Sequence, residues 1–242
     1  MVQEIINVVK RGQRGKEPLN IEKIHDMVEY AVEDISGVSS SQVEMQSGLQ
    51  FYDGMSTDEI QQILVKSAAD LISLKNPNYQ YVAARLLLYS LRKQVFGRLW
   101  DHPHIFDHVN KAVEKGVYDK QILEKYQRKD FDRMENWITH ERDYTFTYAG
   151  LRQVVDKYLV QDRSSDKIYE SPQYMYMLIS AVLFKNYPKE KRLTYVKRYY
   201  EAVSTFKINI KKYICYITVR LCRPNVIFAP IWCYYLGEIY AF

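Results

Sequence analysis

The sequence is poor in the residues that build loops and cross-links. Its 242 residues contain only 9 glycines and 7 prolines, against 22 tyrosines. Because glycine and proline supply most tight turns, this balance favours long helices with aromatic packing over a loop-rich sheet fold. The three cysteines lie near the carboxyl end, at Cys215, Cys222 and Cys233. Their placement excludes a disulfide framework and a paired zinc motif.

The sequence also lacks a strong charge imbalance and a long apolar run. A net charge of +5 fits an anionic ligand, but dense Lys/Arg tracts are absent, so no nucleic-acid partner is expected. The amino-terminal stretch MVQEIINVVKRG is too short and too polar for a signal peptide. The longest uncharged run of the aromatic tail, Pro224–Gly237, is shorter than the roughly 20 residues of a membrane span. We therefore expect a cytoplasmic protein with no membrane partner.

The stretch Val8–His25 predicts a strand, a basic turn, a second short strand and the start of a helix. A ligand that carries phosphate needs cations and backbone N–H groups close together, and such a turn supplies both. The alternative is a basic turn that only faces solvent. Four cations crowd this turn: Lys10, Arg11, Arg14 and Lys16.

Hydrophobic spacing predicts four amphipathic helices and a little sheet before residue 97. Pro18 suits an edge strand, because proline donates no ladder hydrogen bond. We expect Asn20 to cap the first helix, and Ser41–Glu44 to form a capping box for the second. The remaining expected boundaries are a left-handed cap at Gly54, a Thr57 cap on the third helix, and a fourth helix from Asn76-Pro77 to about Gly97.

Two segments of this region resemble a known domain. FYDGMSTDEIQQILVKSAADLISLKNPNYQYVAARLLLYSLRK, residues 51–93, resembles the second half of the ATP-cone of class I ribonucleotide reductase large subunits. Val8–His25 is similar to the first half, through the pattern VxKR…E..N..KI. The turn carries one extra residue, and Gln61 stands where the family often has a histidine. By this resemblance, eight positions contact the nucleotide: Val8, Lys10, Arg11, Glu17, Asn20, Lys23, Thr57 and Lys93.

The resemblance implies ATP or dATP as an allosteric effector, with Mg²⁺ on the triphosphate and neither a covalent cofactor nor a metal site of the chain itself. Three cations, Lys10, Arg11 and Lys93, are suited to neutralise the triphosphate. Glu17 offers an acceptor for the base or ribose, and Asn20 offers both a donor and an acceptor. Such a site is allosteric only if its ligand has different affinity for two global states.

From residue 98 the pattern remains helical. The histidines His102, His104 and His108, with His140 further on, are interpreted as an exposed loop and helix start, because neither cysteines nor well-spaced acids complete a metal site. A hairpin with a polar turn is expected at Tyr158–Glu170. The expected helices are Ile105–Lys115 with Gly116 at its end, Lys120–Tyr126, Phe131–Glu141, Tyr144–Tyr158, Pro172–Tyr187 and Lys189–Thr205.

The phrases KGVYD, HERDYTFTYAG, KYLVQDR, IYESPQYMYM and YVKRYYEAVSTFKI resemble the all-helical domain of the same large subunits. That domain flanks the catalytic barrel and carries little chemistry. The fold class implied is mainly α, with a small β cap on a four-helix bundle. The implied domains are an ATP-cone at 1–97, a helical domain at 98–208 and a divergent aromatic tail at 209–242.

The resemblance ends at about residue 208. The barrel strands and the redox and radical cysteines of the family are absent, and the neighbours of Cys222 do not match its motif. The resemblance therefore implies a ribonucleoside-diphosphate reductase component with no catalytic residues of its own and no activity alone. Its expected partners are the rest of the large subunit on a separate chain and a radical-generating small subunit. The alternatives are a free-standing ATP/dATP sensor and a truncated inactive product. The tail either docks onto the separate chain or reflects out-of-frame translation.

Overall fold

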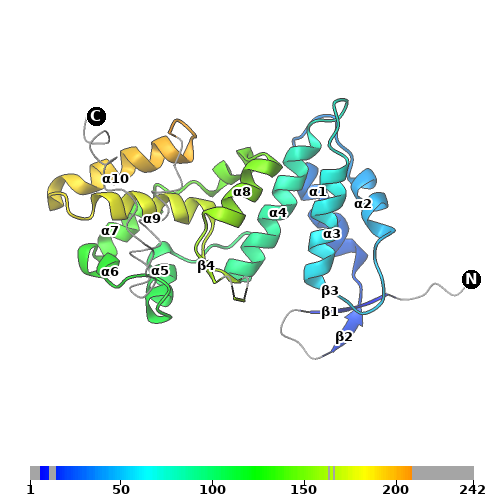
Figure 1. The fold of residues 1–242 in the computed structure, drawn as a ribbon, viewed down its shortest axis with the longest axis horizontal. Coiled ribbons are helices and arrows are strands. Elements are labelled where there is room, and N and C mark those ends of the chain that lie inside the picture. Colours follow the sequence, from blue (N-terminus) through cyan, green and yellow to red (C-terminus); the bar gives the residue numbers. More distant parts are fainter. Residues whose placement is uncertain (1–5, 11–14, 163, 166, 209–242) are drawn as a thin grey trace, which may run out of the picture.

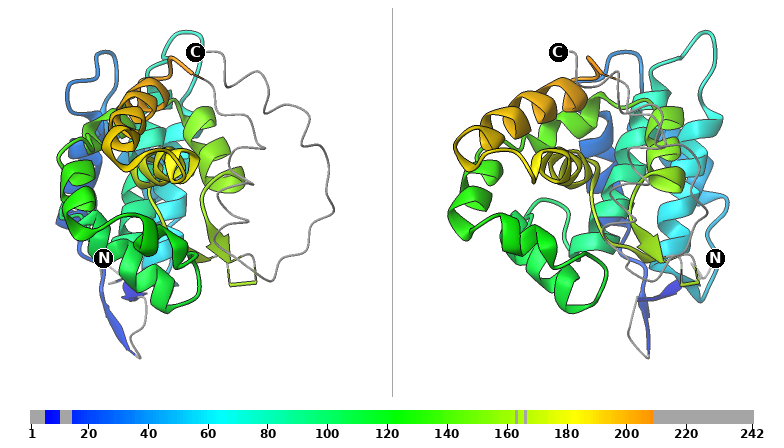
Figure 2. Two further views of the ribbon diagram at one scale, coloured as in Figure 1. Left: turned by 90° about the vertical axis from the view of Figure 1, so that its left-hand side faces the viewer. Right: turned by 60° about the vertical axis from the view of Figure 1, so that its left-hand side comes forward.

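A computed structural model describes residues 6–10, 15–162, 164–165 and 167–208. Within these ranges it has ten α-helices, one 3-10 helix and five short strands, so the mainly α fold is confirmed. Helices α1–α4 gather at one end of the molecule, and the three-stranded sheet lies at one edge of this group (Figure 1). Helices α5–α7, α9 and α10 form the other end, and α8 packs beside α4 (Figures 1 and 2). No helix among the described residues is long and apolar enough to cross a bilayer.

The first part of the chain forms a small sheet on a four-helix bundle. The sheet order is β2-β1-β3, with β1 antiparallel to β2 and parallel to β3. The edge position expected for Pro18 is confirmed, whereas the pairing of β3 was not predicted. The elements are β1 (Asn7–Val9), β2 (Lys16–Pro18), α1 (Ile21–Val32), α2 (Ser40–Gly48), β3 (Met55–Ser56), α3 (Thr57–Asp70) and α4 (Tyr79–Phe96).

Two of the predicted helix boundaries in this bundle are confirmed. The side chain of Asn20 accepts a hydrogen bond from the backbone N–H of Lys23 at 3.0 Å, so Asn20 caps α1. Gly97 ends α4 in the left-handed conformation, with φ +75°. The loop from α4 to α5 therefore begins at a position where glycine is needed.

Other predicted caps are wrong by one or a few residues. Ser56, not Thr57, caps α3, and it forms a capping box with Glu59. The capping box at Ser41–Glu44 does not form, because the cap of α2 is Ser39, two residues before the predicted Ser41. Helix α4 begins at Tyr79, later than the predicted Asn76-Pro77 start.

Gly54 is left-handed, with φ +85°, but it does not cap α2, which ends at Gly48. It lies in the turn into β3, where its N–H donates to the carbonyl of Asn7 at 2.7 Å. A Cβ at this position would lie 3.1 Å from Nζ of Lys16. Glycine is therefore needed both for the turn and for the close approach of that lysine.

The second part of the chain follows the predicted order of elements. Gly116 ends the α5 region with φ +67°, and the predicted hairpin is confirmed as the pair β4–β5. The predicted helix Phe131–Glu141 is wrong at both ends, and Tyr144–Tyr158 divides into a 3-10 helix and α8, which Thr147 caps. The elements are α5 (Ile105–Glu114), α6 (Gln121–Lys125), α7 (Arg128–Glu135), the 3-10 helix η1 (His140–Thr145), α8 (Tyr148–Lys157), β4 (Gln161–Asp162), β5 (Lys167–Ile168), α9 (Pro172–Phe184) and α10 (Lys189–Ser204).

The interpretation of the histidines as an exposed loop is wrong for three of the four. His104 does cap α5, but the ring of His102 stacks on that of His140 at 3.8 Å, and His108 packs against Tyr174. Burial lowers the pKa of His102 and His108 to about 4 and that of His140 to about 3. These three rings are therefore neutral packing residues at pH 7. Among the described residues, no His, Cys, Asp and Glu side chains are grouped as metal ligands.

A buried carboxyl group joins the hairpin to the loop after α5. Glu170 is 3% exposed and accepts hydrogen bonds from Tyr118 Oη at 2.7 Å and from the N–H of Val160 at 2.9 Å. Burial raises its pKa from 4.5 to about 7. The folded state thus holds this proton more tightly than the unfolded chain, and stability must fall as pH rises from about 4.5 to 7.

Replacing Glu170 by glutamine should remove this loss of stability. The amide keeps both contacts, since its oxygen accepts from Val160 and its nitrogen donates to Tyr118. The variant should match the wild type near pH 4.5 and exceed its free energy of unfolding by roughly 3 kcal/mol at pH 8. Urea unfolding at several pH values measures the difference. A difference that does not grow with pH would contradict the raised pKa.

Candidate nucleotide-binding site

The structure describes seven of the eight predicted contact residues; Arg11 lies outside the described residues. Val8 is the buried centre of β1, opposite Glu17 on β2 and Met55 on β3. Nζ of Lys10 lies 2.7 Å from Oε1 of Glu17, and both side chains are about two-fifths exposed, at 40% and 42%. An exposed ion pair of this kind contributes little to stability, so Lys10 is free to exchange its partner for a phosphate.

The other contacts come from three helix ends. Asn20 and Lys23 stand at the start of α1, Thr57 at the start of α3, and Lys93 in the last turn of α4. The charges of Lys23 and of Asp58, which follows Thr57, both act on the Lys93 ammonium group. These ends therefore meet in space, although α1 and α4 are far apart in sequence. Helix amino-termini present backbone N–H groups that favour anions.

Lys93 is partly exposed, and its ammonium group lies against one apolar side chain. Its Nζ lies 4.0 Å from Sδ of Met27, a side chain only 6% exposed. Burial lowers the pKa of Lys93, the positive charge of Lys23 lowers it further, and the negative charge of Asp58 partly offsets both. A desolvated ammonium group is a strong site for an anion, because a phosphate oxygen would replace the lost hydration.

Met27 also contacts Gln61, the residue that stands where the family often has a histidine. Nε2 of Gln61 lies 3.2 Å from Sδ of Met27, and Gln61 is 8% exposed. The sequence placed Met27 in a core stripe, and no pattern marked it as a neighbour of Lys93. The thioether of Met27 thus contacts both Gln61 and Lys93.

A second missed residue, Asp53, holds the basic turn. It accepts hydrogen bonds from the backbone N–H and the side chain of Asn7 at 2.8 and 2.9 Å, and from Nζ of Lys16 at 3.0 Å. The bonds from Asn7, then that from Lys16, lower the pKa of Asp53 to about 2. Lys16 therefore ties β2 to the turn before β3, and it is not among the groups placed to meet a phosphate.

The arrangement is suited to binding and not to bond breaking. It brings together cations, two helix starts and a short sheet edge, which are groups that hold a triphosphate. Of the carboxylates at the site, Glu17 is paired with Lys10, and the charge of Asp58 acts on Lys93. The described residues place no nucleophile and general base together at this position, as covalent or acid–base catalysis would require.

Comparison with known proteins identifies both domains. The family model "ATP cone domain" matches residues 6–94, and "Ribonucleotide reductase, all-alpha domain" matches residues 144–210. The subunit alpha of ribonucleoside-diphosphate reductase 1 from Escherichia coli is 49% identical over 203 residues, which is 84% of this chain and 26% of that protein. The subunit alpha from Haemophilus influenzae is 49% identical over 84% of this chain and 27% of its own length. The subunit alpha from enterobacteria phage T4 is 40% identical over 86% of this chain and 27% of its own length.

These matches agree with the fold and with the order of its two helical groups. The chain spans about a quarter of the length of the curated relatives it matches. The part matched carries the sheet, the four-helix bundle and the helices through α10. The chain belongs, through its ATP-cone and its all-alpha domain, to the family of ribonucleoside-diphosphate reductase large subunits, of which it carries the amino-terminal region.

Proposed function

We propose that this chain is the regulatory amino-terminal region of a ribonucleoside-diphosphate reductase large subunit and that its cone binds ATP or dATP. The observation that carries the proposal is the position of Lys93: its Nζ lies 4.0 Å from Sδ of Met27 on α1, and the charges of Lys23 and Asp58, at the starts of α1 and α3, act on it. The Lys93 side chain is exposed in part, so its ammonium group is only partly desolvated beside the thioether, and an anionic ligand would replace the hydration that it has lost. The match of residues 6–94 to the ATP-cone model supports a nucleotide as that ligand.

In this proposal the cations divide between the two sides of the site. Lys93 and Lys23 approach the phosphates from the helices, and Lys10 approaches them from the strand; Arg11, which lies outside the described residues, is the fourth cation proposed from the sequence. Glu17 and Asn20 meet the base or ribose, while Thr57 offers a hydroxyl and the start of α3. Mg²⁺ accompanies the triphosphate and needs only phosphate and water oxygens. ATP and dATP differ by one ribose hydroxyl, so discrimination falls to the residues at the ribose.

Isothermal titration of the whole chain with Mg·ATP and with Mg·dATP tests the binding step. We expect saturable binding of both nucleotides at one site, and weaker binding of Mg·CTP, which carries the same phosphates on a smaller base. Equal affinity for all three nucleotides would mean that the site binds the triphosphate alone and does not recognise the base. Absence of binding by ATP and dATP would refute the proposal.

The proposed role in reduction requires parts that the matched domains do not supply. Those parts are a catalytic barrel with its cysteines, which we propose lies on a separate chain, and a radical-generating small subunit. This chain mixed with the small subunit alone should form no deoxyribonucleotide from a ribonucleoside diphosphate. Formation of deoxyribonucleotide in that mixture would exclude a purely regulatory role. Affinity capture of the tagged chain from its host, followed by mass spectrometry, should recover a barrel-bearing chain.

A further inference from the structure

A buried polar network joins the last helix of the cone to the second domain. Arg92, on α4, is 2% exposed, and its guanidinium donates to Oη of Tyr144 and to the carbonyl of His140, each at 3.1 Å. The carboxylate of Asp143, also in η1, lies 3.6 Å away and is 1% exposed. The guanidinium also lies over the Tyr144 ring, 5.2 Å from its centroid. One arginine of the cone thus holds a whole turn of η1.

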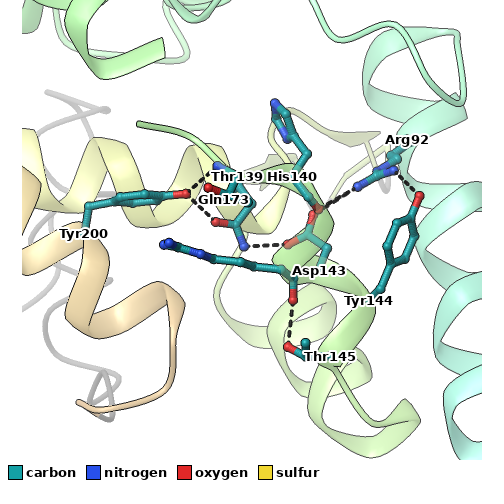
Figure 3. A network of polar contacts seen from close by, with 9 residues as sticks. Arg92, Thr139, His140, Asp143, Tyr144, Thr145, Gln173 and Tyr200 are labelled. Atoms are coloured by element: carbon teal, nitrogen blue, oxygen red, sulfur yellow. Dashed lines mark hydrogen bonds and ion pairs between the residues drawn. The ribbon is translucent and has the colours of Figure 1, made fainter. Parts of the chain in front are cut away.

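The network continues from η1 into α9 and α10, as Figure 3 shows. Nε2 of Gln173, on α9, donates to Oδ1 of Asp143 at 2.8 Å. Oη of Tyr200, on α10, donates to Oε1 of Gln173 at 2.8 Å and accepts from the N–H of Thr139 at 2.9 Å. Gln173 and Tyr200 have no exposed surface. Residues Arg92, Asp143, Tyr144, Gln173 and Tyr200, with the His140 carbonyl, are called the junction network below.

The junction network begins one residue from the proposed phosphate contact. Arg92 and Lys93 are consecutive, so a helical rotation of about 100° points them to different sides of α4. Lys93 faces Met27 on α1, and Arg92 faces η1. An anion that binds Lys93 therefore contacts the same helical turn that carries Arg92.

The central contact of the junction network is incomplete. Among the described residues, neither Oδ2 of Asp143 nor Nε of Arg92 has a hydrogen-bond partner. Nη2 of Arg92 lies 3.6 Å from Oδ2 of Asp143, whereas a charge-assisted N–H···O bond spans about 2.7–2.9 Å. Buried polar groups left partly unsatisfied are costly, so a small movement of this turn changes the energy of the contact steeply. A small movement of α4 toward η1 would therefore shorten this contact to a direct hydrogen bond.

We propose that the junction network couples the nucleotide site to the all-alpha domain: phosphate bound at Lys93 fixes this turn of α4, closes the Arg92–Asp143 pair and orders η1. The inference rests on the proposed function, since it needs a nucleotide in the cone. Arg92 and Asp143 are positioning residues that touch no ligand. By linkage, loosening the junction network must weaken nucleotide binding, because ATP must then order the turn itself.

Hydrogen exchange of the whole chain, with and without saturating Mg·ATP, tests the coupling. We expect ATP to slow exchange in peptides that cover η1 by at least about threefold, as well as in peptides of α1 and α3. In Asp143→Asn the slowing should persist in α1 and α3 and vanish in η1. In the same variant the dissociation constant for ATP should rise at least about threefold, which a purely structural ion pair would leave unchanged.

Tyr200→Phe provides a second variant at the far end of the junction network, where one hydroxyl is removed without leaving a buried charge. It should reduce the ATP-dependent slowing in η1 and leave that in α1 and α3. Slowing in α1 and α3 with unchanged exchange in wild-type η1 would overturn the coupling and leave the nucleotide site standing. No slowing in either place would overturn both.

Discussion

Replacing Arg92 by methionine should lower the free energy of unfolding by about 3–5 kcal/mol, the largest stability effect expected in this chain. Methionine has similar length and packs, but it leaves the Asp143 carboxylate buried without a counter-charge. Burial already raises the pKa of Asp143 to about 6, even with Arg92 beside it. Without Arg92 the carboxyl group must take up a proton or stay charged at a high cost. Urea unfolding at pH 7 measures the loss.

Two comparisons separate this loss from a general effect of removing an arginine. Arg98→Met breaks the pair with Asp101, in which both side chains are 68% exposed, and should change stability by less than about 0.5 kcal/mol. The double variant Arg92→Met with Asp143→Leu should recover part of the loss, since no unpaired charge remains. If the double variant is as unstable as the sum of the single changes, the ion pair is not the cause.

The junction network also contains a part of the fold, η1, that could not be predicted from the sequence. Helical periodicity located the apolar stripes of α1, α3 and α4, because a buried face repeats with the turn of a helix. It could not predict η1, since Phe131–Glu141 and Tyr144–Tyr158 read as ordinary helices. The 3-10 turn forms because side chains from α4 and α9 bond to it, and such contacts leave no local pattern.

Helix caps were predicted with mixed success for a related reason. The prediction of Asn20 as a cap was correct, because this polar residue directly precedes the apolar stripe of α1. Ser56 was missed because Thr57 beside it is an equally good cap by type, and only the position of Glu59 relative to each decides between them. The histidines were misjudged because polarity suggested solvent, whereas neutral imidazoles pack on Tyr174 and on one another.

The candidate site, too, was predicted from the sequence only in part. A resemblance in short motifs named the candidate contacts, and the structure brings the starts of α1 and α3 to Lys93. The sequence named neither Met27, which sets the position of Lys93, nor Asp53, which holds Lys16. Both act on other side chains across the fold, and nothing in their own neighbourhood in the sequence marks them.

The second large effect is expected at the site itself. Lys93→Met should weaken Mg·ATP binding by about thirtyfold or more, equivalent to about 2 kcal/mol, because it removes a partly desolvated cation from the phosphates. Calorimetric titration measures the change. Lys75→Met removes an exposed lysine from the loop between α3 and α4 and should leave the affinity within about twofold.

Stability should move in the opposite direction in this variant. The Lys93 ammonium is partly desolvated beside Met27, which lowers its pKa; because the side chain is also partly exposed, the cost that methionine removes is small. Lys93→Met should therefore unfold at the same urea concentration as the wild type or a higher one, while binding ATP poorly. Sites that hold strain for a ligand behave in this way, because the residue that binds best is not the residue that packs best. A variant that loses binding and stability together would instead make Lys93 a structural residue, and its role as a phosphate contact would have to be abandoned.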